Sequence, residues 1–402
     1  MKKNQKQAVK KPAKKSTKKK TSPNHSFGER ALIAHKRLRG KIEIVPKAKV
    51  RNKADLSIYY TPGVGAVSTF VAKNPEKTRE YTMKGNTVAV VSDGSAVLGL
   101  GNIGPEGALP VMEGKAMLFK ALSGIDAFPI VLATQDTDQI VETVKNIAPG
   151  FGGINLEDIA APRCFEVERR LQAELDIPVL HDDQHGTAMV VLAGLINAFR
   201  AVKKKPSEST VVVSGAGAAG TAITELLLSS GVGNLIMVDS QGIVSRNRKD
   251  MNSFKQVIAR TTNKENRTGS LAEALPGADA LIGVSKGDTV TEEHIRSMNK
   301  DAIVFALSNP VPEIMPDKAK RAGAAVVATG RSDFPNQINN SLGFPGIFRG
   351  ALDNGVKQIT EEMLLRAAKN LAALVKNPTK EHIIPNTFDK GVVRAVAKAI
   401  RE

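Results

Sequence analysis

Four carboxylates are the first candidates for chemistry in this 402-residue chain: Glu157, Asp158, Asp182 and Asp183. Each pair directly follows an apolar run that predicts a β-strand, and a helical pattern lies between the two runs. Parallel strands joined by a helix end at the same edge of a sheet, so we expect the four acids to converge there. Clustered carboxylates repel one another and lose hydration, which a cation or a raised pKa relieves. Mg²⁺ or Mn²⁺ is the simplest cation, because both prefer oxygen ligands.

The elements that must position these acids are a strand at 152–156, a helix at 162–175, a strand at 177–181 and a long helix at 184–202. The same stretch permits a simpler interpretation, in which Asp183 caps the last helix and the other acids are solvated in loops. This stretch alone does not decide between the two interpretations.

Two further residues have types suited to acid–base chemistry. Lys115 lies in an expected helix at 109–122 among small and apolar neighbours, and desolvation there lowers the pKa of a lysine towards its basic form. The alternative for Lys115 is a surface lysine with a buried stem. Tyr60 lies beside a Pro-Gly break, and its alternative is a core side chain with a wet hydroxyl.

A glycine-rich turn predicts a dinucleotide site. It follows a strand at 210–214 and opens a helix at 221–230, and the next strand, 235–238, ends in an acid, Asp239. The first glycine makes the turn, the second admits the pyrophosphate and the third packs the helix on the strand, with the helix N-terminus facing the phosphates. The turn consists of Gly215, Ala216, Gly217, Ala218, Ala219 and Gly220.

Asp239 is expected to bind the ribose hydroxyls, which favours NAD over NADP. The nearby Ser240, Arg246 and Arg248 leave NADP open, because they suit a 2′-phosphate.

Later strands end in loops that face the same side of the sheet. Asn309, which follows a strand at 302–307, is expected to bind nicotinamide or ribose. Asn339 and Asn340 form a polar pair between Pro and Gly breaks, for which a turn-making role is the alternative. The glycine-rich run at 98–104 is expected to form a wall of the active site, since it lacks the features of a phosphate loop.

Charge and composition limit the remaining options. Ten of the 17 net positive charges lie in residues 1–24, which contain no acid and are expected to form a disordered tail that touches acidic partners non-specifically. This tail motivates a rival hypothesis, a nucleic-acid-associated protein built on an inactive dinucleotide-binding fold. The single cysteine, Cys164, excludes a disulfide framework. No apolar run is expected to reach the ~18 residues of a membrane span, so we expect a cytoplasmic protein without membrane contact.

Several blocks together resemble the small-subunit malic enzymes of bacteria and archaea. The similarity covers roughly residues 26–395, and it implies oxidative decarboxylation of L-malate to pyruvate and CO₂ with NAD(P)⁺ and Mg²⁺ or Mn²⁺. The blocks are DLSIYYTPGVG, VSDGSAVLGLGNIGPEGALPVMEGKAMLFK, NLED, HDDQHGTAMVVLAGL, GAGAAG, SNPVPE and PNQINNSLGFPG.

The resemblance also implies a role for each candidate residue. Tyr60 is the acid that protonates the enol, Lys115 is the general base, and Asp182 supports Lys115. The implied metal ligands are Glu157, Asp158 and Asp183. The glycine turn and Asn309 face the cofactor, and the residues implied to bind substrate are Asn309 and Asn340.

One segment departs from the family. Larger animal malic enzymes have an Arg in their DGxR segment that grips the substrate carboxylate, whereas this chain has Ala96 at that place. Other groups must therefore hold the carboxylate, and a metal-dependent 2-hydroxy-acid dehydrogenase that does not decarboxylate is the alternative function.

The expected fold is α/β with two domains. After the tail at 1–24, a malic-enzyme N-terminal domain is expected at 25–161 and a Rossmann-type, doubly wound NAD(P)-binding domain with C-terminal helices at 162–402. We expect a homodimer or a higher homo-oligomer.

Overall fold

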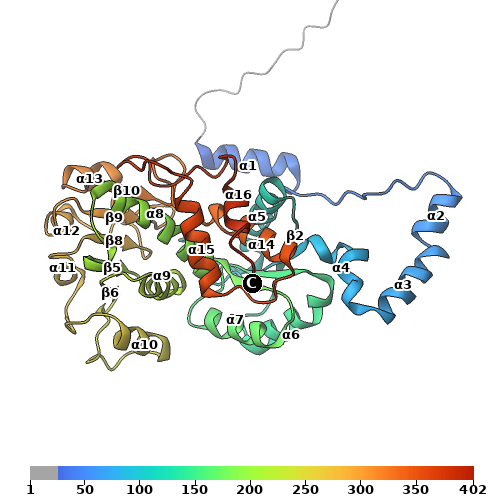
Figure 1. The fold of residues 1–402 in the computed structure, drawn as a ribbon, viewed down its shortest axis with the longest axis horizontal. Helices are drawn as coiled ribbons and strands as arrows, with labels where there is room; N and C mark the ends of the chain where they lie inside the picture. Colours follow the sequence, from blue (N-terminus) through green and yellow to red (C-terminus); the bar gives the residue numbers. More distant parts are fainter. Residues whose placement is uncertain (1–25) are drawn as a thin grey trace, which may run out of the picture. The chain divides into compact units, whose positions relative to one another are not determined.

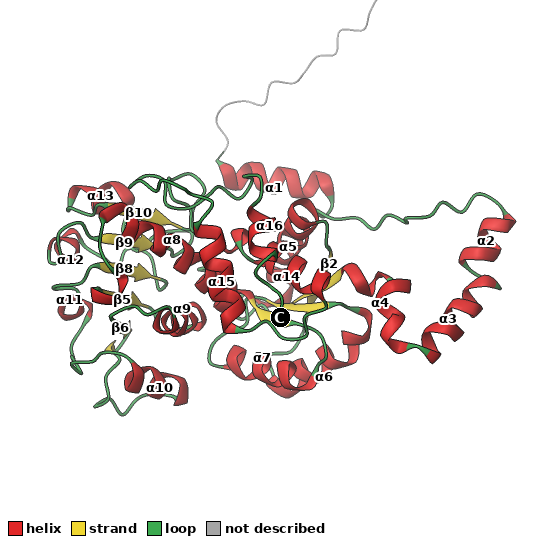
Figure 2. Ribbon diagram, in the orientation of Figure 1, coloured by secondary structure: helices red, strands yellow, loops and turns green. Residues whose placement is uncertain are grey.

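The computed structural model describes residues 26–402 (Figure 1, Figure 2). The chain divides into two compact units, residues 1–43 and residues 44–402. The lysine-rich segment 1–24 lies outside the described residues, so its expected disorder is not addressed by the structure.

The described part of the first unit is built around helix α1 (Phe27–Leu38). The Ser26 hydroxyl accepts a hydrogen bond from the backbone N–H of Glu29, and the Glu29 carboxylate accepts one from the backbone N–H of Ser26. This capping box explains why the helix begins where it does.

The first sheet of the second unit is parallel and has the strand order β2-β1-β3-β4. Strand β1 is buried along its whole length, because its TVAVVS sequence is a nearly continuous run of apolar residues. The neighbouring strands β3 and β4 pair Leu156 with His181, so the residues that follow these two strands leave the sheet side by side. The strands are β1 (Thr87–Ser92), β2 (Asp126–Val131), β3 (Gly153–Leu156) and β4 (Val179–His181).

Helices connect these strands and cover the sheet, as Figure 2 shows. Helix α5 packs against β1 and β2, and α6 packs against α7. The connecting elements are α5 (Gly104–Leu118), η3 (Phe119–Ser123), α6 (Thr137–Ile147), η4 (Ala148–Gly150) and α7 (Arg163–Glu174).

The second sheet has the strand order β10-β9-β8-β5-β6-β7, and only β7 runs antiparallel to its neighbour. From β5 the chain adds β6 and β7 on one side and then crosses to β8 on the other, which is a doubly wound, Rossmann-type sheet. The expected α/β fold class is confirmed. The strands are β5 (Thr210–Ser214), β6 (Asn234–Asp239), β7 (Gly242–Ile243), β8 (Ala280–Gly283), β9 (Ile303–Ala306) and β10 (Val326–Thr329).

Helix α8 (Thr187–Val202) joins the two sheets through one hydrophobic core. A single cluster of buried side chains contains Val88 of the first sheet, most of α8, and Val211 and Phe305 of the second sheet. Together with the preceding π-helical turn η5, the span Asp182–Val202 is long and apolar enough to cross a membrane, which corrects the expectation that no run reaches that length. Because 67% of its apolar window is buried inside the protein, we assign it to the core.

Helices α2 (Lys53–Tyr59) and α3 (Gly63–Lys73) have no buried residue. They pack against each other, and α3 also contacts the short elements that lead to β1 (Figure 1). Their exposed large hydrophobic side chains are Leu56, Ile58, Tyr59, Tyr60, Val64, Val67 and Phe70.

The remaining elements surround the second sheet or link the parts already described, and α9 and α15 both pack against α8. The helices are α4 (Thr78–Tyr81), α9 (Ala218–Ser229), α10 (Ser253–Thr261), α11 (Leu271–Ala274), α12 (Glu292–Arg296), α13 (Pro316–Arg321), α14 (Phe344–Asn354), α15 (Glu361–Ala372) and α16 (Val392–Ala397). The short turns are η1 (Pro75–Lys77), η2 (Met83–Asn86), η5 (Asp182–Gly186), η6 (Pro206–Glu208) and η7 (Asn340–Leu342).

The domain boundary that we expected after residue 161 lies between β3 and β4, which are neighbours in one sheet. The first sheet is complete only at His181, where β4 ends. Strand pairing therefore places the change from one sheet to the other after His181, and the expected domain bounds stay a prediction.

Candidate functional site

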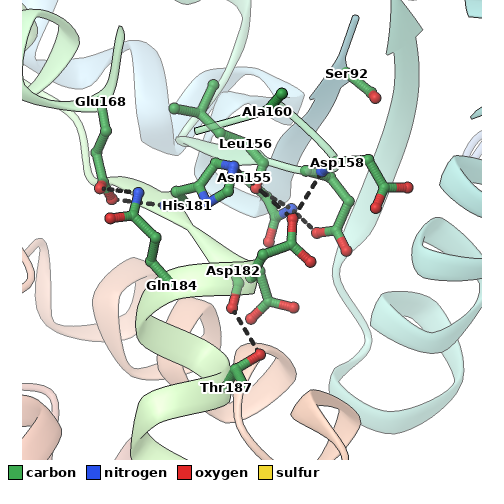
Figure 3. A network of polar contacts seen from close by, with 12 residues as sticks. Ser92, Asn155, Leu156, Asp158, Ala160, Glu168, His181, Asp182, Gln184 and Thr187 are labelled. Carbon is green, nitrogen blue, oxygen red and sulfur yellow. Dashed lines mark hydrogen bonds and ion pairs between the residues drawn. The ribbon is translucent and has the colours of Figure 1, made fainter. Parts of the chain in front are cut away.

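The four acids converge at the carboxyl edge of the first sheet. The backbone N–H of Asp158 donates to Oδ2 of Asp183 at 2.8 Å, which ties the end of β3 to the turn after β4 (Figure 3). Carboxylate oxygens of Glu157, Asp158 and Asp183 all lie within 4.8 Å of one another. The π-helical turn η5 directs its first two side chains differently, so that Asp182 faces Lys115 while Asp183 faces Asp158.

Lys115 extends from α5 into this cluster. Its Nζ lies 2.7 Å from Oε1 of Glu157 and also donates to Oδ2 of Asp182. The amine lies over the ring of Phe344, 4.2 Å from the ring centroid, and the side chain is 7% exposed. Lys115 is therefore a buried ion-pair partner and not a surface lysine.

The ionisation of the cluster is governed by burial and by mutual repulsion. Burial raises the pKa of Asp158 to about 9, and the negative charges of Asp183 and Glu157 add to the shift. Burial also raises the pKa of Asp182 to about 7, although the charge of Lys115 opposes this shift. The free-energy cost of desolvating the carboxylates is not fully offset, because a single lysine faces several of them.

The expected pKa of Lys115 needs correction. Burial lowers the pKa of Lys115, as the sequence indicated, but the charges of Asp182, Glu157 and Asp183 outweigh burial and raise it above the ordinary value. The apolar neighbours in the sequence gave no sign of these acids, which arrive from distant strands. The lysine is accordingly charged when the carboxylates are.

The donor set fits a hard divalent cation. Oδ2 of Asp158 and Oδ1 of Asp182 are buried, and no described residue gives either oxygen a hydrogen bond. Unpaired buried carboxylate oxygens, a separation below 4.8 Å and an excess of negative charge are what an oxygen-ligated metal relieves. The competing interpretation, with Asp183 as a helix cap, is not supported, since η5 has no side-chain cap.

Residues that the sequence analysis missed hold this turn in place. Buried Glu168 of α7 accepts hydrogen bonds from the backbone N–H of His181, at 2.7 Å, and from Nε2 of Gln184, at 2.9 Å (Figure 3). Nε2 of His185 lies 3.0 Å from the same carboxylate. On the other side, Asn155 donates to Glu157 at 2.9 Å. Glu168 is one of three glutamates in α7, and nothing in the sequence distinguishes it for this role.

A guanidinium reaches the segment that departs from the family pattern. Arg163, at the start of α7, donates to Oδ2 of Asp93 at 2.8 Å and to the Ser95 hydroxyl at 2.9 Å. The Ser95 hydroxyl in turn accepts from the backbone N–H of Ala160, and Ala96 N–H donates to the carbonyl of Asp158. Arg163 therefore fixes the loop that carries Asp158.

The glycine turn has the geometry of a dinucleotide cradle. Gly215 has φ +121°, and a Cβ on Gly220 would lie 1.8 Å from the Gly215 carbonyl oxygen. A Cβ on Gly217 would meet no described atom within 4 Å, so this position faces open space. Helix α9 begins directly afterwards without a side-chain cap, leaving its first N–H groups for an anion. The adjoining cavity has a volume of 970 Å³ and extends to Asp239.

Asp239 stands at the end of β6, where the sequence placed it, but its carboxylate is already bound. Arg248 and Lys255 both donate to it, Lys255 at 2.6 Å. Burial tends to raise the pKa of Asp239, but these hydrogen bonds prevail and lower it.

The two asparagines lie on different elements, Asn309 in the loop after β9 and Asn340 in η7. Asn309 follows β9, and a Cβ on Gly99 would lie 2.1 Å from the Asn309 carbonyl oxygen, so the glycine-rich wall contacts this loop. Buried Glu313 accepts from the backbone N–H groups of Ser285 and Ser308, which joins the ends of β8 and β9. Asn340 begins η7, which packs against η5 and thus near the acids.

Tyr60 is not assembled with the other candidates. It ends α2, is 65% exposed and is not among the described contacts of Lys115. The core-plug alternative is also wrong, because the ring is not buried. A single chain thus brings Lys115 together with four carboxylates and leaves Tyr60 outside.

Comparison with known proteins covers both sheets. A family model described as "Malic enzyme, N-terminal domain" matches residues 39–172, and one described as "Malic enzyme, NAD binding domain" matches residues 184–401. The chain is 54% identical over 378 residues to a bifunctional malic/malolactic enzyme of Bacillus subtilis, covering 93% of this chain and 92% of that protein. It is 54% identical over 379 residues to an NAD-dependent malic enzyme of Geobacillus stearothermophilus, covering 94% and 79%. The crystal structure of an NAD-dependent malic enzyme from Thermotoga maritima superposes with a TM-score of 0.90 at 51% identity, covering 92% of this chain and 98% of that one.

Proposed function

The chain belongs to the malic enzyme family, and we propose how the residues described above carry out its reaction. The chain is an NAD(P)-dependent malic enzyme, which oxidises and decarboxylates L-malate to pyruvate and CO₂. The observation that carries the mechanism is the position of Lys115, whose amine is buried against Glu157 and Asp182. Asp182 belongs to the turn η5, which packs against α9, the helix that follows the glycine turn.

Glu157, Asp158 and Asp183 are the proposed ligands of one Mg²⁺ or Mn²⁺ ion. When bound, such an ion lowers the pKa of a coordinated hydroxyl and stabilises negative charge on a neighbouring oxygen. The three side chains also orient the substrate, because their own positions are fixed by Asn155, by the Asp158–Asp183 hydrogen bond and by the loop that Arg163 holds.

Lys115 is the proposed general base for the C2 hydroxyl of malate, and Asp182 is the residue that positions it. A divalent charge on Glu157 and Asp183 would offset part of the attraction that raises the pKa of Lys115, while the charge of Asp182 remains, so that burial then opposes the charged form more effectively. Asp182 holds the amine in place throughout. Asn340 of η7 is the proposed contact for the substrate, and Asn309 is proposed to serve the cofactor side and the substrate together.

We propose that Tyr60 protonates C3 in the site of a second copy of this chain. The exposed apolar side chains of α2 and α3 form an apolar surface in contact with water. Such a surface is typical of a contact between subunits. In a homodimer with a two-fold axis, each subunit would supply the segment that carries Tyr60 to the site of the other subunit, so that both sites are complete. The hydroxyl of Tyr60 is suited to proton donation, because nothing described holds it elsewhere.

Mixed dimers test the exchange of Tyr60. Tyr60→Phe and Lys115→Ala should each lack turnover, and refolding them together should restore about one quarter of wild-type activity, since half the dimers then carry one intact site. A mixture that stays inactive while dimers form, measured by analytical ultracentrifugation, would show that Tyr60 acts within its own chain.

Product analysis tests the reaction itself. The enzyme with L-malate, Mn²⁺ and either NAD⁺ or NADP⁺ should release pyruvate and CO₂ with one reduced cofactor per turnover. Oxaloacetate as the final product would establish the non-decarboxylating dehydrogenase instead. Lactate without net cofactor reduction would place the chain with the malolactic activity that the name of the Bacillus subtilis relative includes. L-Malate and the cofactor are the proposed small-molecule partners, and the cytoplasm is the proposed location.

A further inference from the structure

Positive charge is concentrated at the N-terminal end of the chain. Residues 1–43, the first unit, contain 15 Lys and Arg but two acids, and so carry 13 of the 17 net positive charges. The remaining 359 residues carry the other four. The residues of the proposed mechanism all lie beyond residue 43, so they leave this charge unexplained. A strongly basic unit attached to an enzyme of much lower charge indicates a partner of opposite charge.

The described part of this charge is exposed on α1 and directly after it. Lys36, Arg37 and Arg39 are exposed, and their side chains have no hydrogen bond or ion pair with another described residue. Arg30 lies seven residues before Arg37, so the two guanidinium groups project from the same side of the helix. The carboxylate of Glu29 accepts from the backbone N–H of Ser26 in the capping box. The cations of α1 are therefore available to an external anion.

The first 24 residues extend the same pattern in the sequence. They contain ten Lys and no acid, and residues 14–20 have five Lys in seven positions. Lysine side chains bind the phosphates of a nucleic acid by displacing its counterions, and this binding does not depend on the base sequence. Reading or stacking on bases relies largely on Arg and aromatic side chains, of which residues 1–24 contain none. The composition therefore fits a phosphate backbone without base recognition.

A lipid surface fits this unit less well. A helix that binds a bilayer presents one continuous apolar face. The large apolar side chains of α1 do not share one face, because Leu32 and Ile33 lie five and six residues after Phe27 and project away from it. Residues 1–24 contain no Leu, Ile or Phe that could insert into a bilayer. The unit thus has the charge for an anionic surface without the apolar face for a membrane.

We propose that residues 1–43 bind the phosphate backbone of a nucleic acid without sequence preference. The lysines of residues 1–24 and the cations of α1 each neutralise one phosphate, and the displaced counterions supply the free energy of binding. The residues of the proposed reaction take no part, so the enzyme keeps its turnover when it is bound. This binding goes beyond the proposed function and does not depend on it.

The salt dependence of binding measures this neutralisation of charge. Fluorescence anisotropy of the full chain with two labelled DNA duplexes of about 20 base pairs and unrelated sequence should give equal affinities, since no base is read. Raising the NaCl concentration from about 50 mM to about 200 mM should weaken binding by roughly 10³-fold or more, the loss for about six or more phosphate contacts.

Three lysines of the N-terminal segment test where the contacts lie. The triple variant Lys18→Gln, Lys19→Gln, Lys20→Gln should lower the slope of log affinity against log salt by about 2.7, or about 0.9 for each lost contact. The matched control removes the same charge from three exposed lysines of the second unit and should leave the slope unchanged. Its substitutions are Lys300→Gln, Lys318→Gln and Lys398→Gln.

A double variant extends the test to α1. Lys36→Gln with Arg37→Gln should lower the slope by about 1.8, and an unchanged slope would contradict the part assigned to the helix. Malate turnover of all these variants should equal that of the wild-type protein, which separates a lost contact from a lost fold.

Three results would overturn the proposal as a whole. The first is a wild-type protein that does not bind either duplex at about 50 mM NaCl. The second is an equal slope for the Lys18–Lys20 variant and its control. The third is binding to vesicles of about 30 mol% phosphatidylserine in phosphatidylcholine together with no binding to DNA, which would assign the unit to a lipid surface. The binding assays contain no malate, so failure of the proposed reaction would not affect them.

Discussion

In the carboxylate cluster three acids and one lysine are buried beside the partly exposed Asp183, whereas the cavity beside the glycine turn is lined by one acid and three bases. The acids have raised pKa values because burial removes water from their charged forms and one lysine is the single cation near them among the described residues. Asp239 has a lowered pKa, since burial there is outweighed by two cationic donors. The first region is short of positive charge and the second has a surplus of it.

This difference matches what each region has to bind. A divalent cation supplies the charge that the carboxylates lack, and a phosphorylated nucleotide supplies the charge that the cavity lacks. The proposed cation ligands are mostly buried and are held by hydrogen bonds, while the nucleotide site keeps open space at Gly217 for a large ligand. Charge imbalance and burial, read together, thus distinguish the two kinds of site.

Removal of the lysine should have the largest effect on the cluster. Lys115→Ala should lower turnover by roughly 10²- to 10⁴-fold, the range for loss of a general base, and leave NAD⁺ affinity unchanged. Steady-state kinetics and a nucleotide titration measure the two quantities. Lys120→Ala is the matched control on the same stretch of chain, because that lysine forms an exposed ion pair with Asp126. Full activity of Lys115→Ala would remove it from the mechanism.

Loss of one acid should weaken the cation without affecting the nucleotide. Asp183→Asn keeps the shape but removes a charge, and Mn²⁺ affinity should fall by at least roughly 10- to 100-fold. Electron paramagnetic resonance of free Mn²⁺ measures this directly. Asp138→Asn is a suitable comparison, since this acid is exposed in an ion pair with Arg170 and should leave Mn²⁺ binding unchanged. Equal Mn²⁺ affinity in both variants would contradict the ligand assignment.

Two neighbouring glycines should separate stability from binding in the cofactor region. Gly220→Ala places a Cβ 1.8 Å from the Gly215 carbonyl oxygen, and we expect a loss of about 1–3 kcal/mol in the free energy of unfolding. Gly217→Ala meets no described atom, so stability should hold while NAD⁺ affinity falls by roughly tenfold, or about 1.4 kcal/mol. Denaturant unfolding and calorimetric titration would show the contrast, and a stable Gly220→Ala protein would contradict it.

The remaining prediction concerns the pH dependence of stability in the metal-free protein. The folded pKa of Asp158 is raised to about 9, whereas an unfolded Asp titrates near 4. The folded state therefore holds the proton more tightly, and its contribution to stability is complete below about pH 4 and is lost as the pH rises towards 9. Denaturant midpoints in the presence of a chelator should fall over that interval, and Mn²⁺ should flatten the slope. A slope that persists with Mn²⁺ would assign the effect to other groups.

Local sequence patterns predicted much of the fold. The strand Thr210–Ser214 has the expected bounds, and the helix Arg163–Glu174 lies within one residue of its expected bounds at each end, because β-branched runs and a 3.6-residue apolar period are local properties. Helix α5 instead begins at Gly104, five residues before the expected start, since Pro105 suits a first helical turn. The short polar helix α10 was missed, as its signal is weak and its packing is tertiary.

The site residues also divide into those that local sequence patterns predict and those that depend on contacts between distant elements. The types of Glu157, Asp158, Asp182 and Asp183, together with parallel strand order, predicted that they meet, and the structure brings them together. Their metal-binding roles stay predictions. Glu168 and Arg163 were not predicted, because their partners lie on other elements, and the charged state of Lys115 depends on acids distant in sequence. Tyr60 lies outside this cluster in the single chain, and its place in the site of a second copy stays a proposal.

The core that α8 shares with both sheets has a consequence for unfolding. Val88, Val211 and Phe305 belong to one continuous apolar cluster, so neither sheet can be exposed without stripping apolar contacts from the other. We therefore expect the two regions that match separate family models to unfold in a single cooperative transition. The same cluster packs the sheet that carries the carboxylates against the sheet that carries the glycine turn.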